Sequence, residues 1–289
     1  YSVVGTTFEE ASDALGYDLW KVVQEGPEES LNATSCTQPA LLSASVAIWR
    51  VWQELEGPRP SVMAGHSLGE YSAMVCAGVM SFAEGVNLVR LRGEAMQAAV
   101  PAGEGGMAAI LGLVEAACEK AAQGDVVSAV NYNSPGQVVI AGSKVAVERA
   151  IVACQEAGAR RAMALPVSVP SHCALMRPAA ERLAEAIQTI ELRAPRYKVI
   201  QNVDAQSHAD TATLSTRLVE QLYQPVRWSA CVEAMADQGV EVFIECGPGK
   251  VFTGLNKRIV KGSKGLAVND PDSLEAALEL ARETLADKA

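Results

Sequence analysis

The sequence is poor in histidine, contains no Cys-X-X-Cys pair and has no long apolar run. Three histidines among 289 residues argue against a histidine-rich metal site, so no bound metal is expected. The seven cysteines are widely spread and odd in number, which is typical of buried free thiols in a reducing cytoplasm. No apolar run approaches the roughly 18 residues that span a bilayer, and residues 1–20 lack a signal-peptide pattern. We therefore expect a cytoplasmic protein with no membrane association.

The charge balance is acidic. Lys and Arg total 24 and Asp and Glu total 34, which gives a net charge of −10. Non-specific nucleic-acid binding depends on neutralising phosphates, so this balance disfavours a nucleic-acid partner, although it leaves room for a local basic patch. Apolar residues make up 49% and charged residues 20% of the chain, as in an ordinary globular enzyme.

The opening third of the chain has mainly helical patterns. Apolar spacing predicts a helix over 37–55, with Pro39 in its first turn, where proline is tolerated. The apolar run 61–65 predicts a short buried strand. Helices are predicted at 69–80 and 81–100, and Ser81 followed by Glu84 forms a capping-box pattern at the start of the second.

A composition break at 101–105 begins a segment with a different order of elements. Strand-like runs and two helical runs, at 114–124 and 144–159, follow one another as β-α-β-β-α-β, and 134–136 lies at a predicted hairpin turn. This order predicts an inserted ferredoxin-like small domain over 101–168.

The remainder returns to strand–helix alternation. Strands are predicted at 197–203 and 240–248, and an amphipathic helix at 273–288. Such alternation favours a parallel sheet covered on both faces. We expect an α/β fold: an α/β-hydrolase-like large domain, 1–100 and 169–289, carrying the small domain as an insert.

A serine stands between two glycines in "AGHSLGEYSA", residues 64–73. Gly-X-Ser-X-Gly between a strand and a helix is typical of a nucleophile elbow, where both glycines would permit close backbone approach. Ser67 is then the candidate nucleophile, and the N–H of Leu68 is the natural oxyanion donor at the helix N-terminus. The alternative is a glycine-rich turn with a capping serine.

A serine nucleophile needs a base, and each histidine is a candidate. His66 is adjacent to Ser67, and neighbouring side chains diverge at a sharp turn, so His66 is expected to pack behind the turn or to help shape the pocket. His208 lies in a polar stretch typical of a solvated loop. His172 follows Pro166 and Pro170 just before a helix, the kind of strand-end loop that carries catalytic residues. We therefore favour His172.

No carboxylate between Ser67 and His172 stands out as the third member of a triad, since most candidates lie on exposed helix faces of the insert. The sequence therefore indicates a dyad, or a triad whose third member is not a carboxylate. Arg92 lies among apolar residues on a predicted helix. It is either a snorkelling surface arginine or a guanidinium fork for a substrate carboxylate.

Seven motifs in order along the chain resemble the bacterial malonyl-CoA:acyl carrier protein transacylases of type II fatty acid synthesis. They are "TQPALL", "AGHSLGEYSA", the context of Arg92, "NYNSPGQVVIAG", "VSVPSHCALM", "QLYQPVRW" and "ECGPGK". Together they are far more specific than the pentapeptide alone. The resemblance implies Ser67 as nucleophile, His172 as general base and acid, and Arg92 as the anchor of the malonyl carboxylate. It implies that the backbone carbonyl of Gln221 replaces the triad carboxylate.

Further positions match the family with less defined roles. Gln38, Asn133 and Asn202 match recurrent positions near the pocket, and Ser171 is expected to help select malonyl over methylmalonyl. The resemblance implies a ping-pong transfer from malonyl-CoA to the phosphopantetheine thiol of acyl carrier protein, with no cofactor and as a monomer. Candidate basic residues for docking the acidic carrier lie at 256–264 and at Arg160–Arg161.

The sequence departs from the family at its beginning. The family starts with a strand and a "GQGSQ"-type loop about 25 residues before Tyr1, and the glutamine of that loop supplies the second oxyanion N–H. Losing one such donor typically costs about 10²–10³ in rate. Two other functions stay open on the residues alone: a serine esterase or thioesterase, and a non-catalytic binding protein with the same fold.

Overall fold

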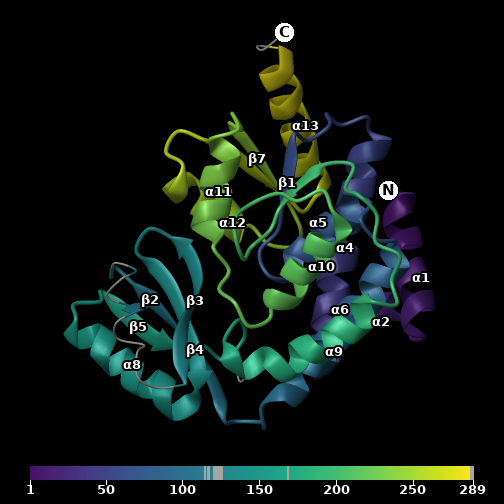
Figure 1. Ribbon diagram of the computed structural model, residues 1–289. Coiled ribbons are helices and arrows are strands. Elements are labelled where there is room, and N and C mark those ends of the chain that lie inside the picture. Colours follow the sequence, from purple (N-terminus) through teal and green to yellow (C-terminus); the bar gives the residue numbers. More distant parts are fainter. Residues whose placement is uncertain (114, 116–117, 120–125, 168, 287–289) are drawn as a thin grey trace.

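Two parallel strand pairs and one four-stranded antiparallel sheet, with helices packed around them, form the framework of the chain (Figure 1). The structure is a computed structural model, and it describes residues 1–113, 115, 118–119, 126–167 and 169–286. The predicted α/β class is confirmed in this coarse sense.

The helices and strands follow one another in this order. Up to the antiparallel sheet they are α1 (Ser2–Leu15), α2 (Leu19–Glu25), α3 (Glu28–Asn32), α4 (Thr34–Glu54), β1 (Val62–Ala64), α5 (Leu68–Cys76) and α6 (Phe82–Ala99). The sheet segment contains β2 (Gly105–Leu111), β3 (Val127–Ser134), β4 (Gln137–Ser143), α8 (Lys144–Glu156) and β5 (Arg161–Ala164). The last part contains η1 (Ala174–Met176), α9 (Arg177–Ile187), β6 (Lys198–Ile200), α10 (Thr211–Glu220), α11 (Trp228–Ala236), β7 (Val242–Cys246), α12 (Val251–Ile259), β8 (Lys264–Val268) and α13 (Pro271–Ala286).

The helices predicted in the first hundred residues are present as α4, α5 and α6. The capping box of α6 is confirmed, since Ser81 Oγ accepts from the Glu84 N–H and the Glu84 carboxylate accepts from the Ser81 N–H. Pro39 is a correction: α4 begins at Thr34, so the proline lies inside the helix and removes one backbone donor there. Apolar faces of α4, α5, α6, α9 and α10 pack together in the largest core cluster.

The parallel strands form two separate pairs, not the single sheet that was predicted. Strand β1 pairs with β6, and β7 pairs with β8. The two pairs do not hydrogen-bond to each other. Instead β1 and β7 line a cavity of about 630 Å³, which leaves β1 half-buried and not buried as expected. Strand β8 was not predicted.

The register of β1 and β6 brings two distant segments together. Ala64 is paired with Ile200, and the two strands run in the same direction. The segments that follow them therefore leave the sheet at the same edge. Residues just after the carboxyl ends of parallel strands form the functional edge of an α/β sheet. Ser67 and Asn202 leave the sheet there.

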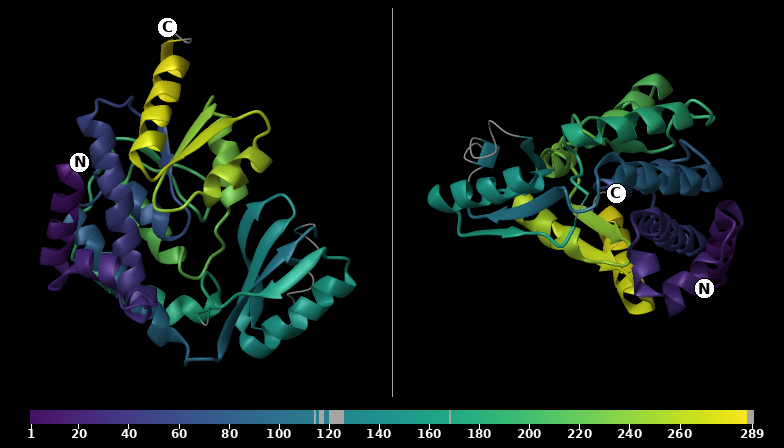
Figure 2. Two further views of the ribbon diagram at one scale, coloured as in Figure 1. Left: turned by 180° about the vertical axis from the view of Figure 1, so that it is seen from behind. Right: turned by 90° about the horizontal axis from the view of Figure 1, so that it is seen from below.

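The antiparallel sheet lies to one side of the helical part, with α8 packed on it, as the views from behind and below show (Figure 2). Its strand order is β3-β4-β2-β5, and the predicted hairpin joins β3 to β4. Most of the helix predicted at 114–124 lies outside the described residues, so the ferredoxin-like description stays a prediction, as does the hydrolase-like one. Backbone hydrogen bonds from Tyr132 N–H to Val226 O, and from Val226 N–H to Val130 O, join this sheet to the rest of the chain.

Candidate active site

Ser67 occupies a sharp turn between β1 and α5. Its backbone has φ 54° and ψ −109°, a strained conformation for a residue other than glycine. Gly65 is required for this turn, because a Cβ there would overlap the Gly69 carbonyl. Gly69 itself has open space at its Cβ position, so the expectation that both glycines allow close approach holds only for Gly65.

Asn202, just after the end of β6, holds the turn in place. Its Oδ1 accepts from the Ser67 N–H at 2.8 Å, and its Nδ2 donates to the Gly65 carbonyl at 2.8 Å. The two bonds satisfy backbone groups on both sides of His66, and they fix the strained conformation that presents the serine hydroxyl. Leu68, the first residue of α5, has an N–H that a helix leaves without an intrahelical partner.

His172 lies beside the serine and is oriented by a carbonyl. Ser67 Oγ is 2.8 Å from His172 Nε2, and His172 Nδ1 is 2.6 Å from the backbone oxygen of Gln221. Burial, and then the charge of Arg92, lower the pKa of His172 to about 3. The imidazole is therefore neutral, so Nδ1–H donates to the carbonyl and Nε2 accepts the serine proton. Like Ser67, His172 has a positive φ, of 63°.

Arg92 is buried beside the serine with only 2% of its surface exposed, so the snorkelling alternative is wrong. Nη1 donates to Gln38 Oε1 at 2.8 Å, and Nη2 donates to Gln221 Oε1 at 3.0 Å and to Ser67 Oγ at 3.1 Å. Its guanidinium lies 5.1 Å from the centre of the Tyr71 ring, and its Nε has no partner among the described residues. The two amide acceptors are neutral, so the positive charge is available to an anion next to Ser67.

His66 makes its contacts outside this hydrogen-bonded cluster. Its Nε2 is 2.8 Å from Asn133 Oδ1 on β3, and its ring stacks on Phe252 at 5.2 Å and lies 5.7 Å from Trp228. Burial lowers the pKa of His66 to about 4, which keeps it neutral. The pair of His66 and Asn133 joins the antiparallel sheet to the serine turn. Ser171 differs from both, because its side chain has no hydrogen-bond partner within the described part of the chain.

Known proteins are similar in sequence to this chain over nearly its whole length. The chain matches the model of the acyl transferase domain family over residues 6–275. A malonyl CoA-acyl carrier protein transacylase from Escherichia coli (strain K12) is 60% identical over 284 residues, covering 97% of this chain and 92% of that protein. The chain belongs to the malonyl-CoA:acyl carrier protein transacylase family.

Solved structures agree with this transacylase family. An acyl carrier protein S-malonyltransferase from Vibrio cholerae superposes with a TM-score of 0.94 at 62% identity, covering 96% of this chain and 92% of that one. A malonyl-transacylase solved in complex with a type II PKS acyl-carrier protein superposes with a TM-score of 0.95 at 58% identity, covering 97% and 92%. The protein is accordingly an acyltransferase.

One residue close to the candidate site was missed by sequence reasoning. Glu70 is completely buried, and it accepts hydrogen bonds from Gln201 Nε2, the Asn202 N–H and Gln221 Nε2. The available signal was a single carboxylate in the otherwise apolar segment that follows the serine.

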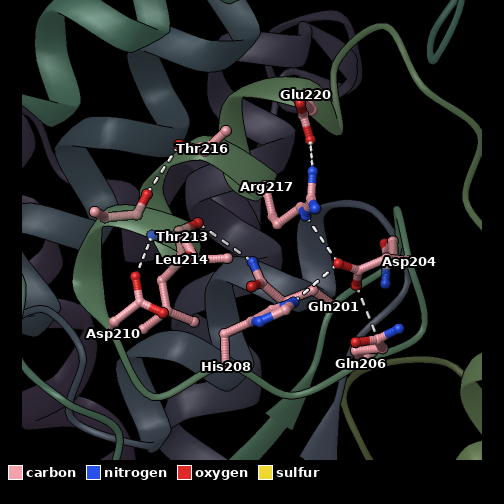
Figure 3. A network of polar contacts seen from close by, with 12 residues as sticks. Gln201, Asp204, Gln206, His208, Asp210, Thr213, Leu214, Thr216, Arg217 and Glu220 are labelled. Carbon is pink, nitrogen blue, oxygen red and sulfur yellow. Dashed lines mark hydrogen bonds and ion pairs between the residues drawn. The ribbon is translucent and has the colours of Figure 1, made fainter.

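His208 is not the solvated histidine that was expected. Its Nε2 lies 2.9 Å from Asp204 Oδ2, which also accepts from Arg217 Nε at 2.8 Å (Figure 3). This network ties the loop after Asn202 to α10, and Gln221 follows α10 directly. It therefore stabilises the relative positions of two site residues without touching Ser67.

The remaining expectations on composition concern thiols, metals and membranes. All seven cysteines are free, as predicted, and five of them are buried. Among the described residues, no group of three or more His, Cys, Asp or Glu side chains could hold a metal ion. No described helix is long and apolar enough to cross a membrane.

Proposed function

We propose that the protein transfers the malonyl group of malonyl-CoA to the phosphopantetheine thiol of acyl carrier protein, through an ester on Ser67. The observation that carries this proposal is the buried guanidinium of Arg92, 3.1 Å from the serine hydroxyl and held by neutral amides. The names of the relatives support the substrates, and the solved complex of a related malonyl-transacylase with its acyl-carrier protein supports the partner.

In the first half-reaction, Ser67 Oγ attacks the thioester carbonyl while His172 Nε2 takes its proton. The carbonyl oxygen becomes an oxyanion, and the N–H of Leu68 at the start of α5 stabilises it. Collapse of the intermediate breaks the C–S bond, His172 returns the proton to the sulfur, and coenzyme A leaves as a thiol.

In the second half-reaction, the carrier's thiol attacks the malonyl ester and His172 takes the thiol proton. The same proton returns to Ser67 Oγ as the ester C–O bond breaks, which regenerates the enzyme. Arg92 binds the malonyl carboxylate in both halves, and water must be kept from the ester or the enzyme becomes a hydrolase.

The surrounding residues hold these groups in place. Gln38 and the side chain of Gln221 orient Arg92, and the Gln221 carbonyl fixes the His172 tautomer. Asn202 holds the serine turn, while His66 and Asn133 brace it against β3. Ser171 borders His172 and bears on acyl selection. The enzyme needs no cofactor of its own, acts as a monomer in the cytoplasm, and docks the carrier on the basic residues of 256–264 and Arg160–Arg161.

Intact-protein mass spectrometry after incubation with malonyl-CoA tests the proposal. The full-length chain, with any residues that precede Tyr1, should gain one malonyl group on Ser67, and the group should leave when holo acyl carrier protein is added. Ser67→Ala is the matched control and should stay unmodified. Release of the group to water at the same rate with and without the carrier would indicate a thioesterase. Absence of any adduct would reject acyl transfer through Ser67.

A further inference from the structure

Glu70 joins the two loops that complete the site. The carboxylate lies on α5, three residues after Ser67, and none of it is exposed. Oε2 accepts from the Asn202 N–H at 2.8 Å and from Gln221 Nε2 at 3.0 Å, and Oε1 accepts from Gln201 Nε2 at 3.1 Å. One carboxylate therefore holds the residue that clamps the serine turn and the residue whose carbonyl orients His172.

Gln221 also links Glu70 to Arg92. Its Oε1 accepts from Arg92 Nη2 at 3.0 Å, while its Nε2 donates to Glu70 Oε2 and to the Ser67 carbonyl. A buried positive charge and a buried negative charge are thus joined through one amide. Neither side chain makes a direct ion pair within the described part of the chain, so the amide of Gln221 is what connects each charge to the opposite one.

We infer that Glu70 is a positioning residue of the proposed transfer: it holds Gln221 and Asn202, and through Gln221 it supplies the counter-charge for Arg92. The inference rests on the proposed function for its acyl substrate, although the contacts it explains belong to the Ser67–His172 pair itself. A merely structural carboxylate would stabilise the fold and leave the reactivity of Ser67 unchanged.

Three titratable or charged groups among the described residues surround Glu70. They are Arg92 from α6, Tyr71 on its own helix and Cys231 from α11. Burial raises the pKa of Tyr71 and of Cys231, so both stay neutral near pH 7. Burial also raises the pKa of Glu70 to about 7, against the hydrogen bonds it accepts and the charge of Arg92. The carboxylate thus loses its charge as the pH falls through 7.

Glu70→Gln removes the charge and keeps the shape. The amide of Gln201 can turn over to face the new side chain, because its Oε1 has no partner among the described residues, and the turn gives up the 3.3 Å hydrogen bond from its Nε2 to the Leu214 carbonyl. The variant is therefore expected to fold. Leu183→Ala is the control for lost stability, since Leu183 is a fully buried, apolar residue of α9 that takes no part in the hydrogen bonds described above.

The experiment measures the labelling rate of Ser67 by a fluorophosphonate, and its malonylation by malonyl-CoA, between pH 5.5 and 8.5 in the full-length enzyme. We expect Glu70→Gln to label roughly 10–100-fold more slowly, the range found for residues that orient metal ligands. The wild-type rate should fall below about pH 7, and this limb should be missing in the variant. Leu183→Ala should keep both the rate and the limb.

Gln221→Met provides a second measurement, because it cuts the bridge and keeps the backbone carbonyl. If Glu70 acts through Gln221, adding Glu70→Gln to this variant should slow labelling much less than it does in the wild type. Wild-type labelling and pH dependence in Glu70→Gln, or an equal loss in Leu183→Ala, would overturn the inference. If the wild type is labelled but never malonylated, the proposed function fails, and the fluorophosphonate result still decides the role of Glu70.

Discussion

Replacing Arg92 by alanine should separate charged from uncharged acyl groups. The guanidinium can offer a malonyl carboxylate two charge-assisted hydrogen bonds, each contributing about 1.5–3 kcal/mol. Loss of both removes about 3–6 kcal/mol, which is roughly a 10²–10⁴-fold drop in the acylation rate at low malonyl-CoA concentration. Arg92→Lys keeps the charge and loses the planar fork, so its rate should lie between those of the wild type and the alanine variant.

An uncharged acyl group should respond in the opposite direction. Arg92 has no anion to bind in acetyl-CoA, and its charge lowers the pKa of His172. Burial is the larger cause of the lowered pKa of His172 and remains in the variant, but removing the charge of Arg92 lets that pKa rise from about 3, which makes the neutral imidazole a stronger base. Acetylation of Ser67 at pH 8 should therefore be unchanged or faster.

The assay compares initial rates of acyl-Ser67 formation from malonyl-CoA and acetyl-CoA by mass spectrometry, in wild type and both variants. Circular dichroism checks that Arg92→Ala is folded, because the substitution leaves a cavity beside Tyr71. Equal loss for the two acyl groups would refute the reasoning, since it would mean that Arg92 supports the site without contacting the substrate.

Two further predictions concern the turn and the response to pH. Gly65→Ala should abolish fluorophosphonate labelling and lower the melting temperature, because the new Cβ would overlap the Gly69 carbonyl. Gly69→Ala should melt at or above the wild-type temperature, because the space at its Cβ position is open. Equal melting temperatures for the two variants would contradict this explanation. The pKa values of His66 and His172, lowered to about 4 and 3, imply stability that is lost as pH falls below 6.5, each costing about 3 kcal/mol by pH 4.5. The pKa of Glu70 is raised to about 7, so Glu70 makes the wild type more stable as the pH falls over the same range. In urea denaturation, the free energy of unfolding of Glu70→Gln should therefore fall more steeply with decreasing pH than that of the wild type. Equal pH dependence in the two proteins would refute this assignment.

The sequence led to the candidate reacting side chains because each leaves a local pattern. Ser67 stands in a glycine-framed turn, His172 follows two prolines, and Arg92 is a charge in an apolar helix. Gln221 could come only from the family resemblance, since a backbone carbonyl has no side-chain signature. Glu70 was missed because α5 is buried on nearly every side, and the rule that charged residues mark the exposed face of a helix fails there.

The strand pairing was harder to predict than the strands. Nearly half of the chain separates β1 from β6 in the sequence, and no local pattern specifies that Ala64 pairs with Ile200. Strand β8, beginning Lys264–Gly265, has neither alternation nor a long apolar run, so its partner β7 defines it more than its own residues do. Prediction from pattern therefore reached the elements around Ser67, while the edge where they meet required the structure.

The carbonyl at His172 Nδ1 and the bridged carboxylate of Glu70 answer the same electrostatic requirement. A carboxylate bonded directly to His172 would stand close to Arg92 and neutralise the charge that must attract an anionic substrate. A carbonyl fixes the imidazole tautomer without that cost, and Glu70 supplies negative charge one amide further away. Since Arg92 lowers the pKa of His172, a malonyl carboxylate that pairs with Arg92 must raise that pKa again. The proposed substrate would thereby strengthen the base that reacts with it, and an acyl-CoA without the carboxylate would leave the base weak.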